Sequence, residues 1–160
     1  MTIYTFGYEG LDSHAFTATL LTEGIQTVVD VREVPISRKP GFSKTALSKL
    51  LTKLGIAYLH EAALGCPKTV RNQYRVDGDW HRYCRGFLAH LRTQMEAITG
   101  LAQQVQTSRC ALICFEADFR YCHRTMVADA LSAQTNLPVQ HLKATTHSAT
   151  ATSSRSLSLA

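Results

Sequence analysis

Reactive side chains are concentrated in one fifteen-residue segment, Cys110–Arg124. An apolar run with the composition of a β-strand ends in Cys114 and Glu116, and a short loop then leads to Cys122 and His123 at the start of an expected helix. In α/β sheets, ligands bind beyond the carboxyl ends of the strands. The segment therefore predicts a functional site that contains two thiols, a carboxylate, an imidazole and a guanidinium.

Cys122 is expected at a helix N-terminus, where free amide groups and the helix dipole stabilise a thiolate or a bound anion. His123 and Arg124 add positive charge, which lowers a thiol pKa below its usual value of about 8.5. This arrangement predicts a nucleophilic or redox-active thiolate, or a cradle for phosphate. The alternative is structural: Cys122 would be a small buried side chain, and Arg124 would pair with a carboxylate such as Glu116.

Two other chemistries fit the same segment less well. Cys114 and Arg120 have the spacing of a phosphatase loop, but Glu116 and Asp118 would repel the phosphate and no glycine allows the tight turn. Zinc is an alternative because thiols and imidazoles are its ligands. Cys110 and Cys114 would lie about 13 Å apart on one strand, too far for one ion. The ligands of a zinc site would therefore have to be Cys114, Cys122, His123 and a residue distant in the sequence, such as His60.

Basic residues outside this segment form two further candidate groups. Asp30 ends a β-branched run and could orient Arg32, so that Arg32 and Arg38 bind anionic oxygens in forked geometry. An ordinary ion pair at the strand–loop corner is the alternative. Residues 68–92 interleave basic and aromatic side chains, a mixture that suits nucleic-acid contact. The candidate contacts are Arg75, Trp80, Arg82 and Arg85, although such a stripe also fits a helix with buried aromatics and solvated arginines.

The apolar patterns predict strands that alternate with helices along the chain. The expected strands are 3–8, 27–31, 56–59, 110–115 and 139–142, and the expected helices begin near residues 13, 43, 88 and 124. Residues 61–78 show no period and are expected to form a long loop, and one long helix is expected over 88–105. Such alternation is typical of a single three-layer α/β domain, with a mostly parallel sheet of about five strands and helices on both faces.

Length and composition indicate the extent of this domain, its cellular compartment and its class of partner. Residues 1–143 of the 160 are assigned to one domain, and residues 144–160, rich in Ala, Thr and Ser, to a disordered tail. Five cysteines, an odd number, predict reduced thiols in a cytoplasmic protein rather than a disulfide framework. No apolar run is long enough to cross a membrane, so no membrane partner is expected. The net charge of +5 favours anionic partners.

The sequence resembles a family of unknown function, DUF488, to which the YeaO-like proteins are related. Five stretches carry the resemblance: 6–9, 29–38 with 41–43, 55–60 with 64–65, 112–116 with 122–124, and 139–141. They include Val-Asp-Val-Arg from Val29 and the Cys-x-Glu and Cys-His-Arg motifs that start at Cys114 and Cys122. The resemblance implies a compact α/β fold and places these residues in one site: Arg32, Ser37, Arg38, His60, Cys114, Glu116, Cys122, His123 and Arg124.

Three functional hypotheses follow from these patterns. The first is an enzyme that acts on a phosphate-bearing small molecule, nucleotide or nucleic acid. Its catalytic residues would be Cys114, Glu116, Cys122 and His123, and its anion-binding residues Arg32, Ser37, Arg38, His60 and Arg124. The second is a non-catalytic nucleic-acid-binding module that uses residues 68–92. The third is a metal-binding or redox-sensing thiol protein. No cofactor is predicted, and the expected partner is an anionic small molecule or a nucleic acid.

Overall fold

The computed structural model describes residues 1–144, so the predicted tail lies outside the described residues except for Ala144. Its centre is one sheet in which every pair of neighbouring strands is parallel. The strand order is β3-β2-β4-β1-β5. The strands are β1 Ile3–Gly7, β2 Thr27–Asp30, β3 Ala57–His60, β4 Cys110–Cys114 and β5 Val139–His141. The predicted parallel α/β sheet is confirmed.

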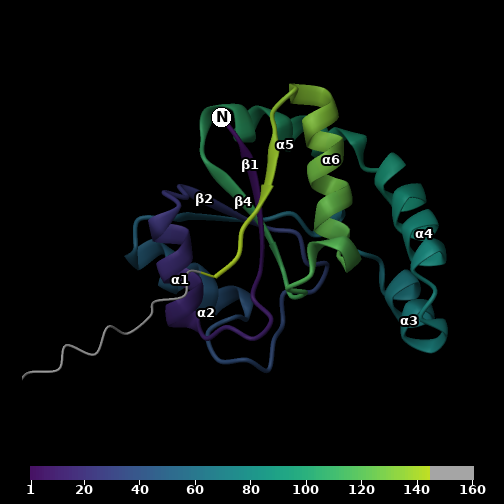
Figure 1. Cartoon of the computed structure of the whole chain (residues 1–160), viewed down its shortest axis with the longest axis horizontal. Helices are drawn as coiled ribbons and strands as arrows, with labels where there is room; N and C mark the ends of the chain where they lie inside the picture. Colours follow the sequence, from purple (N-terminus) through teal and green to yellow (C-terminus); the bar gives the residue numbers. More distant parts are fainter. Residues whose placement is uncertain (145–160) are drawn as a thin grey trace, which may run out of the picture.

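Helices cover both faces of this sheet, as Figure 1 shows. Helices α1 (Ser13–Thr22) and α2 (Lys44–Lys53) contribute Phe16, Leu20, Leu47 and Leu51 to the core on one face. The other face is covered by α5 (Met95–Thr107) and α6 (His123–Thr135), and α3 (Lys68–Asp77) and α4 (Trp80–Arg92) lie farther out. No helix within residues 1–144 is long and apolar enough to cross a lipid bilayer.

Two of the predicted elements are wrong. The expected loop 61–78 contains a short 3-10 helix, Ala62–Leu64, and the ten-residue helix α3. Helix α3 is mostly polar, and only Val70 and Tyr74 pack against the core, so too few apolar residues mark its period in the sequence. The single helix expected over 88–105 is two helices, because the chain turns between α4 and α5. There, the amide groups of Thr93 and Gln94 donate to the carbonyls of His90 and Leu91, three residues earlier.

The sheet brings the carboxyl ends of its central strands together. Gly7 at the end of β1 is paired with Cys114 at the end of β4, and Asp30 at the end of β2 is paired with Ile113. The chain leaves β2 toward α2 on one face and leaves β4 toward α6 on the opposite face. Such a divergence opens a crevice where parallel sheets bind ligands.

Candidate functional site

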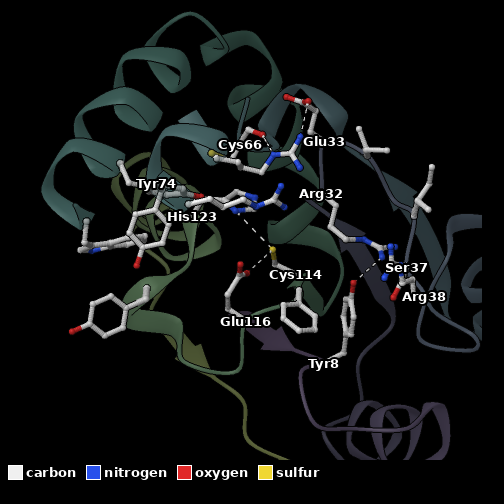
Figure 2. Close-up of a pocket in the computed structure, with 18 residues that line it drawn as sticks. Tyr8, Arg32, Glu33, Ser37, Arg38, Cys66, Tyr74, Cys114, Glu116 and His123 are labelled. Atoms are coloured by element: carbon white, nitrogen blue, oxygen red, sulfur yellow. Dashed lines mark hydrogen bonds and ion pairs between the residues drawn. The ribbon is translucent and has the colours of Figure 1, made fainter. Parts of the chain in front are cut away.

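A pocket of about 500 Å³ lies at this edge of the sheet. Cys114, Glu116 and His123 line it together with Arg38 and Arg75. Figure 2 shows Glu116 and His123 beside Cys114, with Ser37 and Arg38 on one side and Tyr74 on the other. The pocket therefore combines reactive side chains with basic ones from distant parts of the chain.

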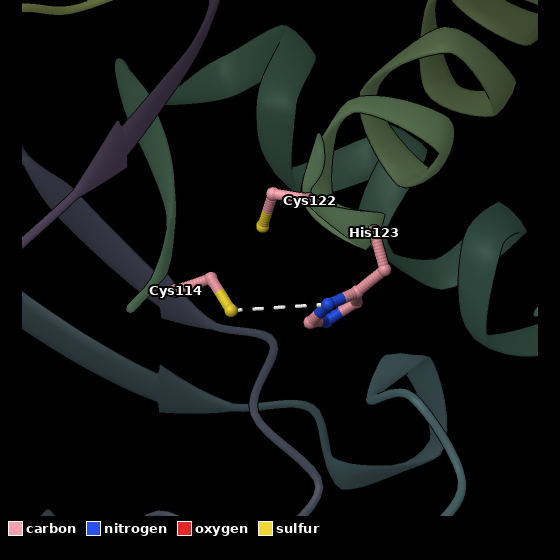
Figure 3. A group of neighbouring side chains, drawn as sticks. All are labelled: Cys114, Cys122 and His123. Atoms are coloured by element: carbon pink, nitrogen blue, oxygen red, sulfur yellow. Dashed lines mark hydrogen bonds between the residues drawn. The ribbon is translucent and has the colours of Figure 1, made fainter. Parts of the chain in front are cut away.

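The reactive side chains form a compact cluster. The thiol of Cys114 donates a hydrogen bond to Oε2 of Glu116 at 3.3 Å, and its sulfur lies 3.8 Å from Nδ1 of His123. The sulfur of Cys122 lies in the same group: the ligand atoms of Cys114, Cys122 and His123 are all within 4.8 Å of one another. In Figure 3, Cys114 comes from the end of β4, and the other two come from the start of α6. Cys122 is only 1% exposed and lies beneath the pocket lining.

Backbone contacts fix the loop that carries Glu116. The guanidinium of Arg124, almost fully buried, donates to the carbonyls of Glu116 and Ala117. On the other side of the loop, Gly7 lies so close that a Cβ atom there would overlap the carbonyl of Glu116. Arg124 is therefore engaged with the backbone and does not line the pocket, where the sequence placed it as an anion-binding residue.

His123 has a defined tautomer. Its Nε2 lies 2.6 Å from the carbonyl oxygen of Val31, and a carbonyl can only accept, so Nε2 carries a hydrogen and donates. In the neutral imidazole, the lone pair is then on Nδ1, which faces Cys114. The imidazole can thus accept a proton or act as a ligand on the side of the thiols.

The two thiols of the cluster differ in their readiness to ionise. Burial opposes ionisation of Cys122, but hydrogen bonds with Cys114 and His123 outweigh it and hold the pKa of Cys122 well below its ordinary value. The hydrogen bond to Cys122, together with burial, raises the pKa of Cys114 well above its ordinary value. The cluster therefore favours one thiolate, at Cys122, next to a thiol at Cys114.

Asp30 and Arg32 form a buried ion pair at the strand–loop corner. Arg32 donates through Nε and Nη2 to the two carboxylate oxygens of Asp30, at 2.8 and 2.7 Å. Its Nη1 donates to the hydroxyl of Tyr8 and to the carbonyl of Phe42. His60 donates from Nε2 to the carbonyl of Arg32 at 2.8 Å. Arg32 lines the pocket, but its side-chain donors bind Asp30, Tyr8 and Phe42 at the strand–loop corner. His60 stabilises the same corner and does not line the pocket.

The remaining arginines of the pocket fall into two kinds. Arg71 is engaged, because it donates to Glu33 at 3.1 Å and to the carbonyl of Cys66 at 3.0 Å. Arg38 and Arg75, by contrast, have no hydrogen-bond or ion-pair partner among residues 1–144. These two guanidinium groups are available to a ligand.

An aromatic cluster forms one wall of the pocket. The ring of Trp80 stacks on Tyr83, with centroids 4.6 Å apart, and meets Tyr74 and Tyr121 edge-on. Tyr121 is about half exposed at the rim, and all four rings line the pocket. The wall offers flat apolar surface in the pocket that Arg75, the next residue after Tyr74 in α3, also lines.

Other residues that the sequence singled out divide between the pocket and its surroundings. Ser37 lines the pocket, and its hydroxyl accepts a hydrogen bond from the amide of Lys39. Arg82 forms an exposed ion pair with Asp77, and Arg85 is exposed on α4 outside the pocket lining. Arg71, Tyr74 and Tyr83 belong to the predicted segment 68–92 but were not named as candidate contacts, and Tyr121 was not predicted at all. Tyr121 directly precedes the Cys-His-Arg motif, a position that could have identified it.

Comparison with known proteins places most of the chain in one family. Residues 13–131 match the family model described as a domain of unknown function, DUF488. No curated protein matches the chain, and no solved structure matches it. The match covers both Val-Asp-Val-Arg and the segment that carries the cysteine cluster.

Proposed function

The chain belongs to the DUF488 family, and we propose that it is an enzyme that acts on a nucleotide-like substrate, with a phosphate group and a flat ring. One observation carries this proposal. Two arginines without partners among residues 1–144 share a pocket with an aromatic wall and with the cluster of Cys114, Glu116 and His123.

The arginines support an anionic substrate. Guanidinium groups bind phosphate oxygens through paired, charge-assisted hydrogen bonds. The other arginines that line the pocket, Arg32 and Arg71, already have carboxylate partners, so Arg38 and Arg75 are left to bind the phosphate.

The aromatic wall supports a ring in the same substrate. Nucleobases stack on tyrosine and tryptophan side chains, which contributes roughly 1–3 kcal/mol per base. Trp80 contacts both Tyr74 and Tyr121, and Arg75 follows Tyr74 directly in α3, so a ring and a phosphate of one molecule can be bound together.

The cluster supplies the reacting groups. Glu116 is the proton acceptor of the proposed reaction, since its carboxylate lines the pocket and lies 3.3 Å from Cys114. Cys114 and His123 line the pocket and would contact the reacting atoms, whereas Cys122 acts from beneath them.

Nucleic-acid binding is the second candidate, and the placement of its predicted contacts weighs against it. Arg75 and Trp80 lie in the pocket, but Arg82 is paired with Asp77 and Arg85 is exposed elsewhere on α4. A continuous strand would need these four residues along one track. Their division favours a small ligand.

The fluorescence of Trp80 tests the proposal directly, because it is the chain's single tryptophan and lines the pocket. Titration with AMP should change this emission, and Arg75→Ala should weaken the binding of AMP roughly 10- to 100-fold, the usual effect of losing charge-assisted hydrogen bonds. The matched variant Arg85→Ala should bind AMP as the original protein does. If Arg85→Ala weakens binding as much as Arg75→Ala, the proposed pocket is wrong.

Catalysis is tested by a second variant in the same assay. A panel of nucleoside phosphates should contain one that the protein converts, as measured by chromatography of the products. Glu116→Gln should then abolish conversion and keep the affinity measured through Trp80, because the amide fills the same space and cannot accept the proton. Undiminished turnover in Glu116→Gln would exclude the proposed reaction centre.

A further inference from the structure

The cluster at the bottom of the pocket has the composition of a metal site. Cys114, Cys122 and His123 are all buried, and their ligand atoms converge from two elements on one point (Figure 3). We propose that these three residues bind one zinc ion, with a fourth coordination position open to the pocket.

The distances fit a tetrahedral ion. Zinc binds sulfur at about 2.3 Å and nitrogen at about 2.0–2.1 Å, which places ligand atoms about 3.5–3.8 Å apart around one tetrahedral centre. The sulfur of Cys114 lies 3.8 Å from Nδ1 of His123, and all three ligand atoms are within 4.8 Å of one another. Small side-chain rotations therefore complete the site without backbone movement.

The orientation of His123 fits the same role. Histidines that bind metals almost always donate their second ring N–H to a carboxylate or a backbone carbonyl, which fixes the ring. Nε2 of His123 donates to the carbonyl of Val31 at 2.6 Å, so Nδ1 is presented to the two sulfurs. The ring is held in place for coordination by a contact that lies outside the cluster.

The charges of the site also suit a divalent cation. Two thiolates neutralise one zinc ion, so the loaded site adds no net charge to a buried position next to Arg124. The free amide groups at the start of α6 stabilise the thiolate of Cys122 in the loaded site. Thiolate and imidazole ligands select zinc over calcium or magnesium, which prefer oxygen.

The open position has a catalytic consequence, which alone rests on the proposed function. Catalytic zinc sites use three protein ligands and keep the fourth position for water. Cys114, His123 and Glu116 all line the pocket, and the carboxylate of Glu116 lies 3.3 Å from Cys114, so a fourth position on the pocket side would lie near Glu116. The carboxylate of Glu116 would accept a proton from that water, and the cysteines would serve as ligands rather than as nucleophiles.

Metal content tests the site. The full chain, purified with a reductant, is dialysed against zinc and then against buffer, and zinc is counted by mass spectrometry. We expect one zinc per chain, and loss of at least 90% of it in Cys114→Ser, Cys122→Ser and His123→Ala. The controls Cys84→Ser and His14→Asn change residues outside the cluster and should retain one zinc. Zinc that survives Cys114→Ser, or a chain that binds none, would overturn the proposal.

Cobalt provides a readout that needs no variant to fold. Co²⁺ added to the unaltered chain should give strong visible bands of a tetrahedral ion and a thiolate charge-transfer band in the near ultraviolet. Cyanide should shift the visible bands by occupying the open position. Weak octahedral bands, or a spectrum that cyanide leaves unchanged, would contradict the proposed coordination.

The two proposals fail in different ways. Binding of AMP is read from Trp80 with and without zinc, and zinc is counted with and without AMP. A chain that binds AMP and no zinc retains the proposed pocket and loses the metal site. A chain that binds zinc but neither binds nor converts a nucleotide keeps the metal site and loses the proposed function.

Discussion

The buried ion pair of Asp30 and Arg32 beside the pocket has an effect on stability that can be measured. Asp30 is fully buried and accepts hydrogen bonds from the guanidinium of Arg32 and from the hydroxyl of Tyr58 at 2.6 Å. Burial alone would lower the pKa of Arg32, but the hydrogen bonds and charge of Asp30 outweigh it and raise that pKa. Arg32 thus remains charged and depends on one carboxylate.

Replacing that carboxylate should destabilise the fold strongly. Asp30→Asn leaves the buried guanidinium of Arg32 without an anionic partner, and a loss of about 3–5 kcal/mol in the free energy of unfolding is expected. Urea unfolding followed by circular dichroism measures it. Arg120→Gln is the matched control, since it breaks an exposed pair with Asp118 and should leave the unfolding curve almost unchanged. Equal curves for the two variants would show that the buried pair stabilises nothing.

The same contacts explain which site residues the sequence could predict. Strand ends identified Cys114, Glu116 and Arg38, which line the pocket. The sequence also chose Arg124 and His60, which do not line the pocket and instead donate to the backbone carbonyls of Glu116 and Arg32. Position at an edge follows from the alternation of strands and helices, but the direction of a long side chain depends on contacts with residues far away in the sequence.

At the scale of an element, the end of β1 determines the position of Glu116. Gly7→Ala would place a Cβ on the carbonyl of Glu116, so the loop must move, at a cost of roughly 1–3 kcal/mol. The control is Gly100→Ala in the middle of α5, where a Cβ meets no other atom within 4 Å. That change should instead stabilise the fold by up to about 1 kcal/mol, because alanine favours helix. Thermal unfolding of both variants checks the opposite signs.

Helices differ in how clearly the sequence encodes them. In α2, Leu47 and Leu51 are fully buried at a helical spacing, and the helix is predicted correctly. In α3, only Val70 and Tyr74, one turn apart, pack against the core, and Val76 is 84% exposed, so two apolar positions are too few to predict the helix. The turn between α4 and α5 contains neither Gly nor Pro, and apolar residues on either side continue the spacing. Because only backbone hydrogen bonds form this turn, the amino-acid composition contains no signal that predicts it.

For the molecule as a whole, stability is distributed unevenly around the pocket. Strand β4 is buried along its full length and lies between β2 and β1, whereas α3 has no buried residue and its main helical neighbour is α4. Segments with few buried contacts open locally, and central strands exchange amide hydrogens only when the whole domain unfolds. The wall that carries Tyr74 and Arg75 is therefore the part of the pocket that we expect to open most easily.

Hydrogen exchange measured by mass spectrometry gives the corresponding test. Peptides from α3 should exchange much faster than those from β4, and AMP should slow α3 because it links Arg75 to the rest of the pocket. Peptides from α1, on the opposite face of the sheet, should exchange equally with and without AMP. The control ligand is adenosine, which lacks the phosphate and should protect α3 less. If α3 exchanges as slowly as β4 without a ligand, the wall is rigid and the pocket is preformed. If bound AMP leaves α3 unprotected, Arg75 is not part of the AMP site.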